Sequence, residues 1–82
     1  MNRNFVLQNL REARDELARI TKEIESRDDY DNVEYEIDMR HLYHHLNTAW
    51  NTKDFSDERI ERCNDKDFRN WRQFPKDMDM SV

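Results

Sequence analysis

All three histidines of the chain stand within five residues, as His41, His44 and His45. On a helix, Asp38, His41 and His45 share one side, so that one carboxylate and two imidazoles can face the same ion. Three protein ligands that leave an open position are typical of a catalytic zinc or iron site. The spacing is therefore compatible with a metal site at Asp38, His41 and His45, with His44 as an exchange ligand.

Two other interpretations of the histidine cluster stay open. The chain lacks His-Glu-x-x-His and the repeated carboxylate and histidine pairs of di-iron bundles. The histidines can instead be structural, either facing solvent or hydrogen-bonded. They can also give a pH response, because protonating all three changes the formal charge of −5 by three units. We expect structural histidines and no cofactor, and we keep a metal-binding helical bundle as the alternative function.

Other catalytic patterns are weak. The single cysteine, Cys63, can pair with His44 or His45 in a thiol enzyme, but it lies at helical spacing from Ile60, where a small buried apolar residue is the more frequent role. The chain has no glycine, which excludes the usual phosphate-binding loops. We therefore predict a non-enzymatic protein. A lone cysteine also forms no internal disulfide and favours a reducing, cytoplasmic location.

The aromatic residues of the second half of the chain suggest a surface for protein–protein interaction. Tryptophan, tyrosine and arginine are enriched at the energetic centres of interfaces, but aromatic residues fill cores and dimer interfaces as well. The candidate interaction surface comprises Tyr43, Trp50, Phe68, Trp71, Arg72 and Phe74. A change of Trp71 to alanine separates the two roles, because only a core residue lowers the melting temperature strongly.

Composition restricts the fold to one small domain without β-sheet. The chain has 82 residues, 40% of them charged and 35% hydrophobic, with one proline. Sandwiches and barrels need frequent turn-forming glycines, so we predict an all-α domain over 1–82. A net charge of −5 argues against nucleic acid as a partner. No apolar run reaches the roughly 18–20 residues of a membrane span, so we expect no membrane partner.

Two heptad patterns predict two long helices, over about 4–26 and 33–53. The first follows Val6, Leu10, Ala13, Leu17, Ile20 and Ile24, and the second follows Tyr35, Met39, Leu42, Leu46, Ala49 and Lys53. Alternating steps of four and three place each set on one stripe of a helix. The polar stretch between the helices favours a turn, so the pair is expected to form an antiparallel hairpin.

The rest of the chain predicts two short helices, over about 57–63 and 65–73, and a disordered tail over 76–82. Ser56 can cap the first, Asn64 or Asp65 can cap the second, and Pro75 stops it. A hairpin of this size cannot bury both apolar stripes by itself. We therefore expect a homodimer in which two hairpins form a four-helix bundle, acting as an interaction or regulatory module with an unidentified protein partner.

Overall fold

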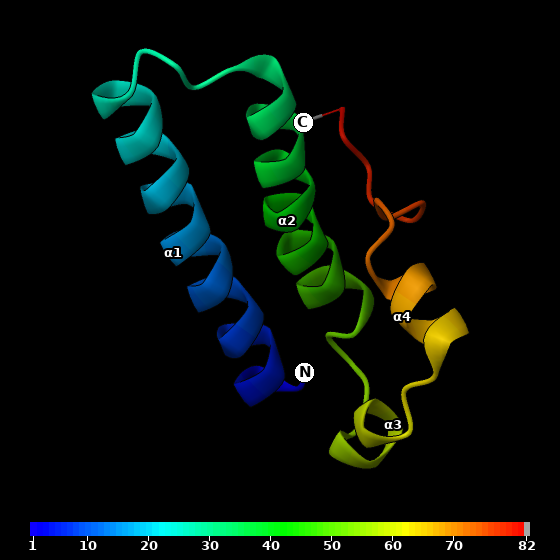
Figure 1. Ribbon diagram of the computed structural model, residues 1–82. Coiled ribbons are helices and arrows are strands. Elements are labelled where there is room, and N and C mark those ends of the chain that lie inside the picture. The colour runs from blue at the N-terminus through cyan, green and yellow to red at the C-terminus, as the bar shows by residue number, and fades with distance from the viewer. Residues whose placement is uncertain (82) are drawn as a thin grey trace.

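The computed structural model describes residues 1–81, which form four helices and no strand (Figure 1). Helices α1 (Arg3–Ser26) and α2 (Asn32–Asn51) lie side by side and antiparallel. The short helices α3 (Asp57–Glu61) and α4 (Asp65–Trp71) follow, and α4 packs against α2 on the side away from α1. The all-α fold and the helical hairpin predicted from the sequence are confirmed. The two short helices end two residues earlier than predicted.

Each helix begins at a residue whose side chain accepts a hydrogen bond from the backbone of the first turn. Asn2 caps α1, Asp31 caps α2 and Ser56 caps α3. Asn64 caps α4 in a reciprocal capping box with Asp67. Such caps satisfy backbone N–H groups that have no partner within the helix, which explains why these boundaries are readable from local sequence.

The core of the single chain is small. Ala13 and Ile20 of α1 pack against Leu42 of α2, and Met39 lies beside them half-buried. A second cluster forms around Trp71, which meets the ring of Phe55 edge to face at 5.4 Å. These clusters fix the hairpin and hold the C-terminal helices against its open end.

The hairpin buries only part of each heptad stripe. In α1, Ala13 and Ile20 face α2, whereas Leu10, Leu17 and Ile24 are 43%, 53% and 49% exposed. In α2, Leu42 and Ala49 are buried, but Tyr35 and Leu46 are 44% and 39% exposed. A single partner helix covers one line of residues along a helix, so the second line of each stripe remains in contact with solvent.

After α4 the chain continues without helix, beside α2 (Figure 1). Asp77 of this segment accepts a hydrogen bond from the indole of Trp50 at 3.0 Å. The tail predicted as disordered, 76–82, ends in Val82, which lies outside the described residues. The chain is elongated, with a radius of gyration of 14.5 Å against about 12 Å for a compact domain of this length.

Candidate functional site

The hairpin has two faces of opposite character. Leu10 and Leu17 stand three residues before Ala13 and Ile20, and Met39 and Leu46 stand three residues before Leu42 and Ala49. A step of three residues rotates a side chain by about 60° from the contact line. In an antiparallel pair, equal rotations in the two helices point to the same face. We define the apolar face as Leu10, Leu17 and Ile24 of α1 with Tyr35, Met39 and Leu46 of α2.

The opposite rotation gives a polar face, which we define as Glu12, Glu16, Arg19, Glu23, Asp38 and His45. Contacts between the helices confirm that these residues share one side. Arg19 of α1 pairs with Asp38 of α2 at 2.8 Å, and Glu12 lies 3.1 Å from the imidazole of His45. The charged and polar side chains of the two helices therefore pair with each other across the polar face. The side chains of the apolar face make no comparable polar contacts between the helices.

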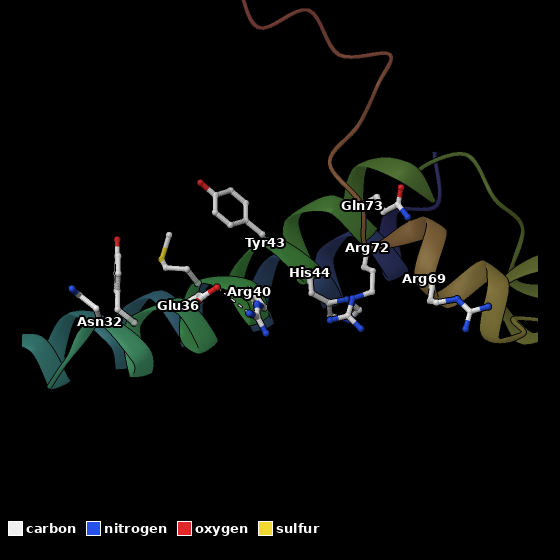
Figure 2. A pocket seen from close by; sticks show the side chains of 10 residues that line it. Asn32, Glu36, Arg40, Tyr43, His44, Arg69, Arg72 and Gln73 are labelled. Atoms are coloured by element: carbon white, nitrogen blue, oxygen red, sulfur yellow. Dashed lines mark hydrogen bonds and ion pairs between the residues drawn. The ribbon is translucent and has the colours of Figure 1, made fainter.

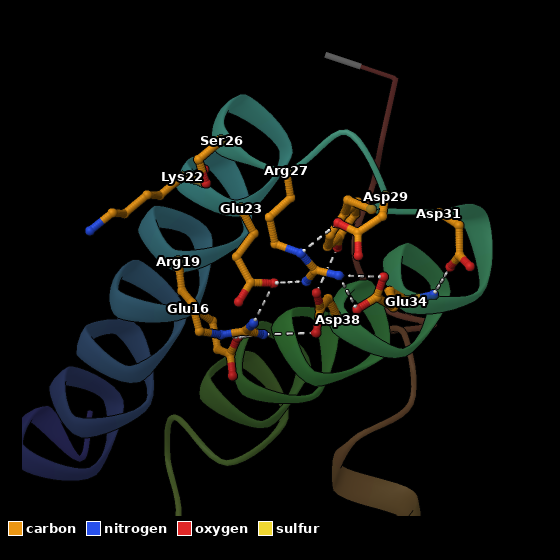
Figure 3. Close-up of polar contacts among 11 residues, drawn as sticks. Glu16, Arg19, Lys22, Glu23, Ser26, Arg27, Asp29, Asp31, Glu34 and Asp38 are labelled. Carbon is orange, nitrogen blue, oxygen red and sulfur yellow. Dashed lines mark hydrogen bonds and ion pairs between the residues drawn. The ribbon is translucent and has the colours of Figure 1, made fainter.

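An ion-pair network lies on the polar face at the loop end of the hairpin (Figure 3). Arg19 also pairs with Glu16 at 2.7 Å and with Glu23 at 3.4 Å. Glu23 is shared with Arg27, which in turn contacts Glu34 at 3.1 Å. The network connects α1, the loop and α2.

Asp38 is the most enclosed member of this network. Its side chain accepts hydrogen bonds from the Tyr30 hydroxyl at 2.6 Å and from Arg19 at 2.8 Å. These two bonds hold the pKa of the Asp38 carboxyl below its usual range. Burial and the bond to Asp38 raise the pKa of Tyr30 to about 12. Asp38 is therefore an ionised structural residue whose two oxygens are already occupied.

The structure does not bring the predicted metal ligands to one point. Asp38 is bound by Arg19 and Tyr30, His41 is exposed, and His45 lies against Glu12. Across residues 1–81, no three His, Cys, Asp or Glu side chains gather in an arrangement that could hold a metal ion. The alternative of a metal site at Asp38, His41 and His45 rests on sequence spacing alone.

His44 packs against α4, whereas His45 lies against Glu12 of α1. The His44 ring lies 5.2 Å from the ring of Phe68 in α4 and 5.1 Å from His45. Burial and the nearby Arg72 guanidinium lower the pKa of His44, so its imidazole is neutral at pH 7. The sequence predicted histidines that face solvent or are hydrogen-bonded; His44 instead packs half-buried against Phe68, and its Nδ1 has no hydrogen-bond partner among the described residues.

The six residues of the predicted interaction surface have different environments. Tyr43, Phe68 and Phe74 are 48%, 46% and 52% exposed, whereas Trp50 and Arg72 are half-buried. Trp71 is only 8% exposed and packs within the chain, so its placement on a free surface is wrong. Its ring also lies 5.2 Å from the Arg59 guanidinium, which binds Asp67 of α4. Trp71 is a core residue of the monomer.

Tyr43 and Arg72 line a groove between α2 and α4, which we call the arginine groove (Figure 2). Arg40 of α2 and Arg69 of α4 also line it, and Glu36 pairs with Arg40 at 2.9 Å. Three arginines therefore line one groove in a chain of net charge −5. Guanidinium groups bind carboxylates in two-pronged geometry, so the groove suits an acidic group of a partner. Arg69 and Arg72 are three residues apart in sequence, but only the packing of α4 against α2 brings them to the same groove as Arg40.

Two further features were misjudged or missed from the sequence. Cys63 was expected to be buried, but it is exposed because α3 ends at Glu61 and Cys63 lies in the break before α4. Asn47 and Asn51 of α2 contact the end of α4. Their side-chain amides donate to the backbone carbonyls of Arg72 and Trp71, both at 2.8 Å, and so satisfy the end of α4.

No family model, curated protein or solved structure matches this chain. Within residues 1–81, no helix combines the length and the apolarity that crossing a bilayer requires. Any assignment of function therefore has to come from the surfaces described above.

Proposed function

We propose that this protein is a non-enzymatic interaction module that acts as a homodimer, in which the apolar faces of two hairpins pack together into a four-helix bundle. The observation that supports the proposal is the apolar face itself. Its leucine, isoleucine and tyrosine side chains are between 39% and 53% exposed, and they lie on one side of two adjacent helices. Monomeric proteins rarely expose a continuous apolar surface of this kind.

The amount of exposed surface supports an interface of ordinary size. The chain exposes 6496 Å², whereas a folded monomer of 10.2 kDa exposes about 5,300 Å² by the usual mass scaling. The excess of about 1,200 Å² exceeds the roughly 800 Å² that each partner buries in a standard interface. The hairpin face, about 36 Å by 20 Å from helix dimensions, has a similar footprint.

A second copy is the occupant that this face fits best. Leu10, Leu17 and Ile24 recur every seven residues, which is the spacing at which helices interlock along their length. Two-fold pairing of one patch with itself is the commonest arrangement of soluble oligomers. In such a bundle the polar faces point outward, so the net charge of each chain stays in water. Tyr35 and Met39 also line the arginine groove, so the partner hairpin would border that groove.

Sedimentation equilibrium tests the proposal with a matched pair of variants. Leu17→Glu places a carboxylate on the apolar face, whereas Ile37→Glu changes a residue of α2 that is 47% exposed but lies off that face. Burying one large aliphatic side chain contributes about 1.5–3 kcal/mol, and a symmetric dimer contains two copies of Leu17. We therefore expect Leu17→Glu to raise the dissociation constant by at least about 100-fold.

The outcomes separate clearly. A wild-type dimer that Leu17→Glu dissociates and Ile37→Glu leaves intact supports the proposal. A wild-type chain that sediments as a monomer at 100-micromolar loading, about 100 times above a micromolar dissociation constant, refutes it. Equal effects of the two variants would show that the copies meet through another surface.

A further inference from the structure

The arginine groove combines apolar surface with positive charge. Its volume is about 840 Å³, within the range of sites that bind ligands. Tyr43 and Met39 of α2 contribute apolar surface to its lining. Arg40 contributes positive charge from α2, and Arg69 and Arg72 contribute it from α4 (Figure 2). A ligand in the groove would therefore meet apolar side chains on one helix and cations on the other.

Arg72 is held in place although no carboxylate of the described chain binds it. Its guanidinium lies over the ring of Phe68, 5.1 Å from the ring centre. Among residues 1–81, neither Arg72 nor Arg69 forms an ion pair. Arg72 is half-buried, but its nitrogens reach solvent. Stacking on an aromatic ring orients a guanidinium without using its N–H donors, so those donors are open to a ligand.

The charge of the groove is opposite to that of the whole chain. Glu36 is the one acidic residue among its lining residues, so three arginines leave a formal charge of +2 in a chain of −5. Glu36 pairs with Arg40 at 2.9 Å, but solvent screens this contact because both side chains are more than 60% exposed. An acidic ligand is therefore attracted to the groove and repelled by much of the remaining surface.

The shape and chemistry of the groove suit an acidic peptide better than other anions. A free phosphate would leave Tyr43 and Met39 without contact, and a nucleic acid would bring many phosphates against an acidic chain. The lining residues of α2 run from Asn32 to His44, which is about 18 Å along the helix axis. About five to six residues of extended peptide span that length, and their side chains point alternately to opposite sides. One set can face the arginines of α4 and the other the apolar residues of α2.

We propose that the arginine groove binds a short acidic peptide of a partner protein, with its carboxylates on Arg69 and Arg72 and an apolar side chain on Tyr43. Arginine clusters bind acidic motifs in this way, and arginine and tyrosine often dominate the energy of such contacts. The inference deepens the proposed function, because it gives the interaction module the chemical class of its partner. It does not require the dimer, since these three residues lie outside the apolar face.

A dye-labelled peptide of alternating aspartate and leucine, about six residues long, is the probe. Its control has asparagine in place of aspartate, and fluorescence anisotropy follows binding to the full chain at low salt. We expect the control peptide to bind at least about tenfold more weakly, because charge-assisted hydrogen bonds are the stronger ones. Arg69→Gln and Arg72→Gln should each weaken the aspartate peptide by about tenfold. Arg11→Gln removes the same charge from an exposed residue of α1 outside the groove and should change its affinity by less than about twofold.

The outcomes distinguish the charge of the ligand from its position. Equal binding of the two peptides, or no saturable binding of either, would overturn the proposal. An effect of Arg11→Gln as large as that of Arg69→Gln would refute the placement in the groove. Arg69 is exposed and forms no ion pair or aromatic contact within residues 1–81, so Arg69→Gln remains a valid test if Arg72→Gln disturbs the packing on Phe68.

The same experiment keeps the groove and the dimer separate. Leu17→Glu alters the apolar face and leaves Arg69, Arg72 and Tyr43 in place, so its affinity for the aspartate peptide should stay within about twofold of the wild type. A wild-type chain that sediments as a monomer and binds the peptide would refute the dimer and support the groove. A dimer that does not bind the peptide would support the proposed function and refute the inference about the groove.

Discussion

Replacing Asp38 by asparagine removes one negative charge from the polar face while keeping the size of the side chain. In the wild type, Asp38 accepts from Tyr30 at 2.6 Å and from Arg19 at 2.8 Å. An asparagine oxygen can still accept one of these bonds, but its amide group would point donor hydrogens at the other donor. The variant therefore loses an ion pair and leaves one donor of the hairpin interface unsatisfied.

The magnitude follows from the enclosure of the two partners. Asp38 is 9% exposed, and hydrogen bonds to a charged group contribute about 1.5–3 kcal/mol. Solvent screens the ionic part, because the Arg19 side chain is 42% exposed and keeps its contacts with Glu16 and Glu23. We therefore expect Asp38→Asn to lower the free energy of unfolding by about 2 kcal/mol. For a domain of this size that corresponds to a fall of about 8–16 °C in melting temperature.

Urea unfolding followed by circular dichroism, at one fixed protein concentration, measures this difference. Asp15→Asn is the matched control, because Asp15 pairs with Arg14 at 3.2 Å while both side chains are more than 70% exposed. Such a surface pair contributes between zero and about 1 kcal/mol. If Asp38→Asn costs no more than Asp15→Asn, the polar face does not hold the hairpin together as argued here.

The effect of Asp38 also has a defined pH dependence. Its pKa is lowered in the folded protein, chiefly by the bond from Tyr30 and then by Arg19, whereas an unfolded aspartate titrates near 3.9. A group with a depressed folded pKa stabilises the protein above its unfolded pKa, and that contribution is lost as the pH falls through the folded value. The difference between wild type and Asp38→Asn should thus be complete above pH 5 and shrink below about pH 4.

Three further predictions concern other parts of the fold. Trp71→Ala should lower the free energy of unfolding by about 3–5 kcal/mol, whereas Phe74→Ala, at a residue that is 52% exposed, should change it by less than about 0.5 kcal/mol in the same urea experiment. The pKa of Tyr30 is raised to about 12, so the Tyr30 hydroxyl stabilises the fold below pH 10 and this stabilisation is lost as the pH rises toward 12. Tyr30→Phe should therefore show a smaller fall in the free energy of unfolding between pH 10 and pH 12 than the wild type does. Asn51→Ala removes the donor to the carbonyls of Trp71 and Gln73, and should increase amide hydrogen exchange in α4 relative to α1.

Helix positions were predictable because their signals are local. Asn64 and Ser56 cap the helices that the sequence assigned to them, and heptad spacing located both long helices. Because the chain is short and a polar stretch joins the two long helices, an antiparallel hairpin was the simplest arrangement in which the two apolar stripes could cover each other. These inferences need only residues that are neighbours along the chain or along one helix.

Features that depend on tertiary contacts were not predictable in the same way. Whether Trp71 faces a core or a surface depends on Phe55 and Arg59, which approach it only after α3 and α4 fold back. The exposure of Cys63 follows from a break after Glu61 that helical spacing does not show.

The division of each heptad stripe follows from the repeat of the α-helix. Ala13 and Ile20 of α1 and Leu42 and Ala49 of α2 are buried. The leucines three residues earlier are rotated by about 60° from this contact line, so they lie at the edge of the interface, where no part of the described chain shields them fully. The proposed dimer would cover the second line of each stripe with a second layer of helices. We expect that layer on the apolar face, because the charges of the polar face already pair across the hairpin.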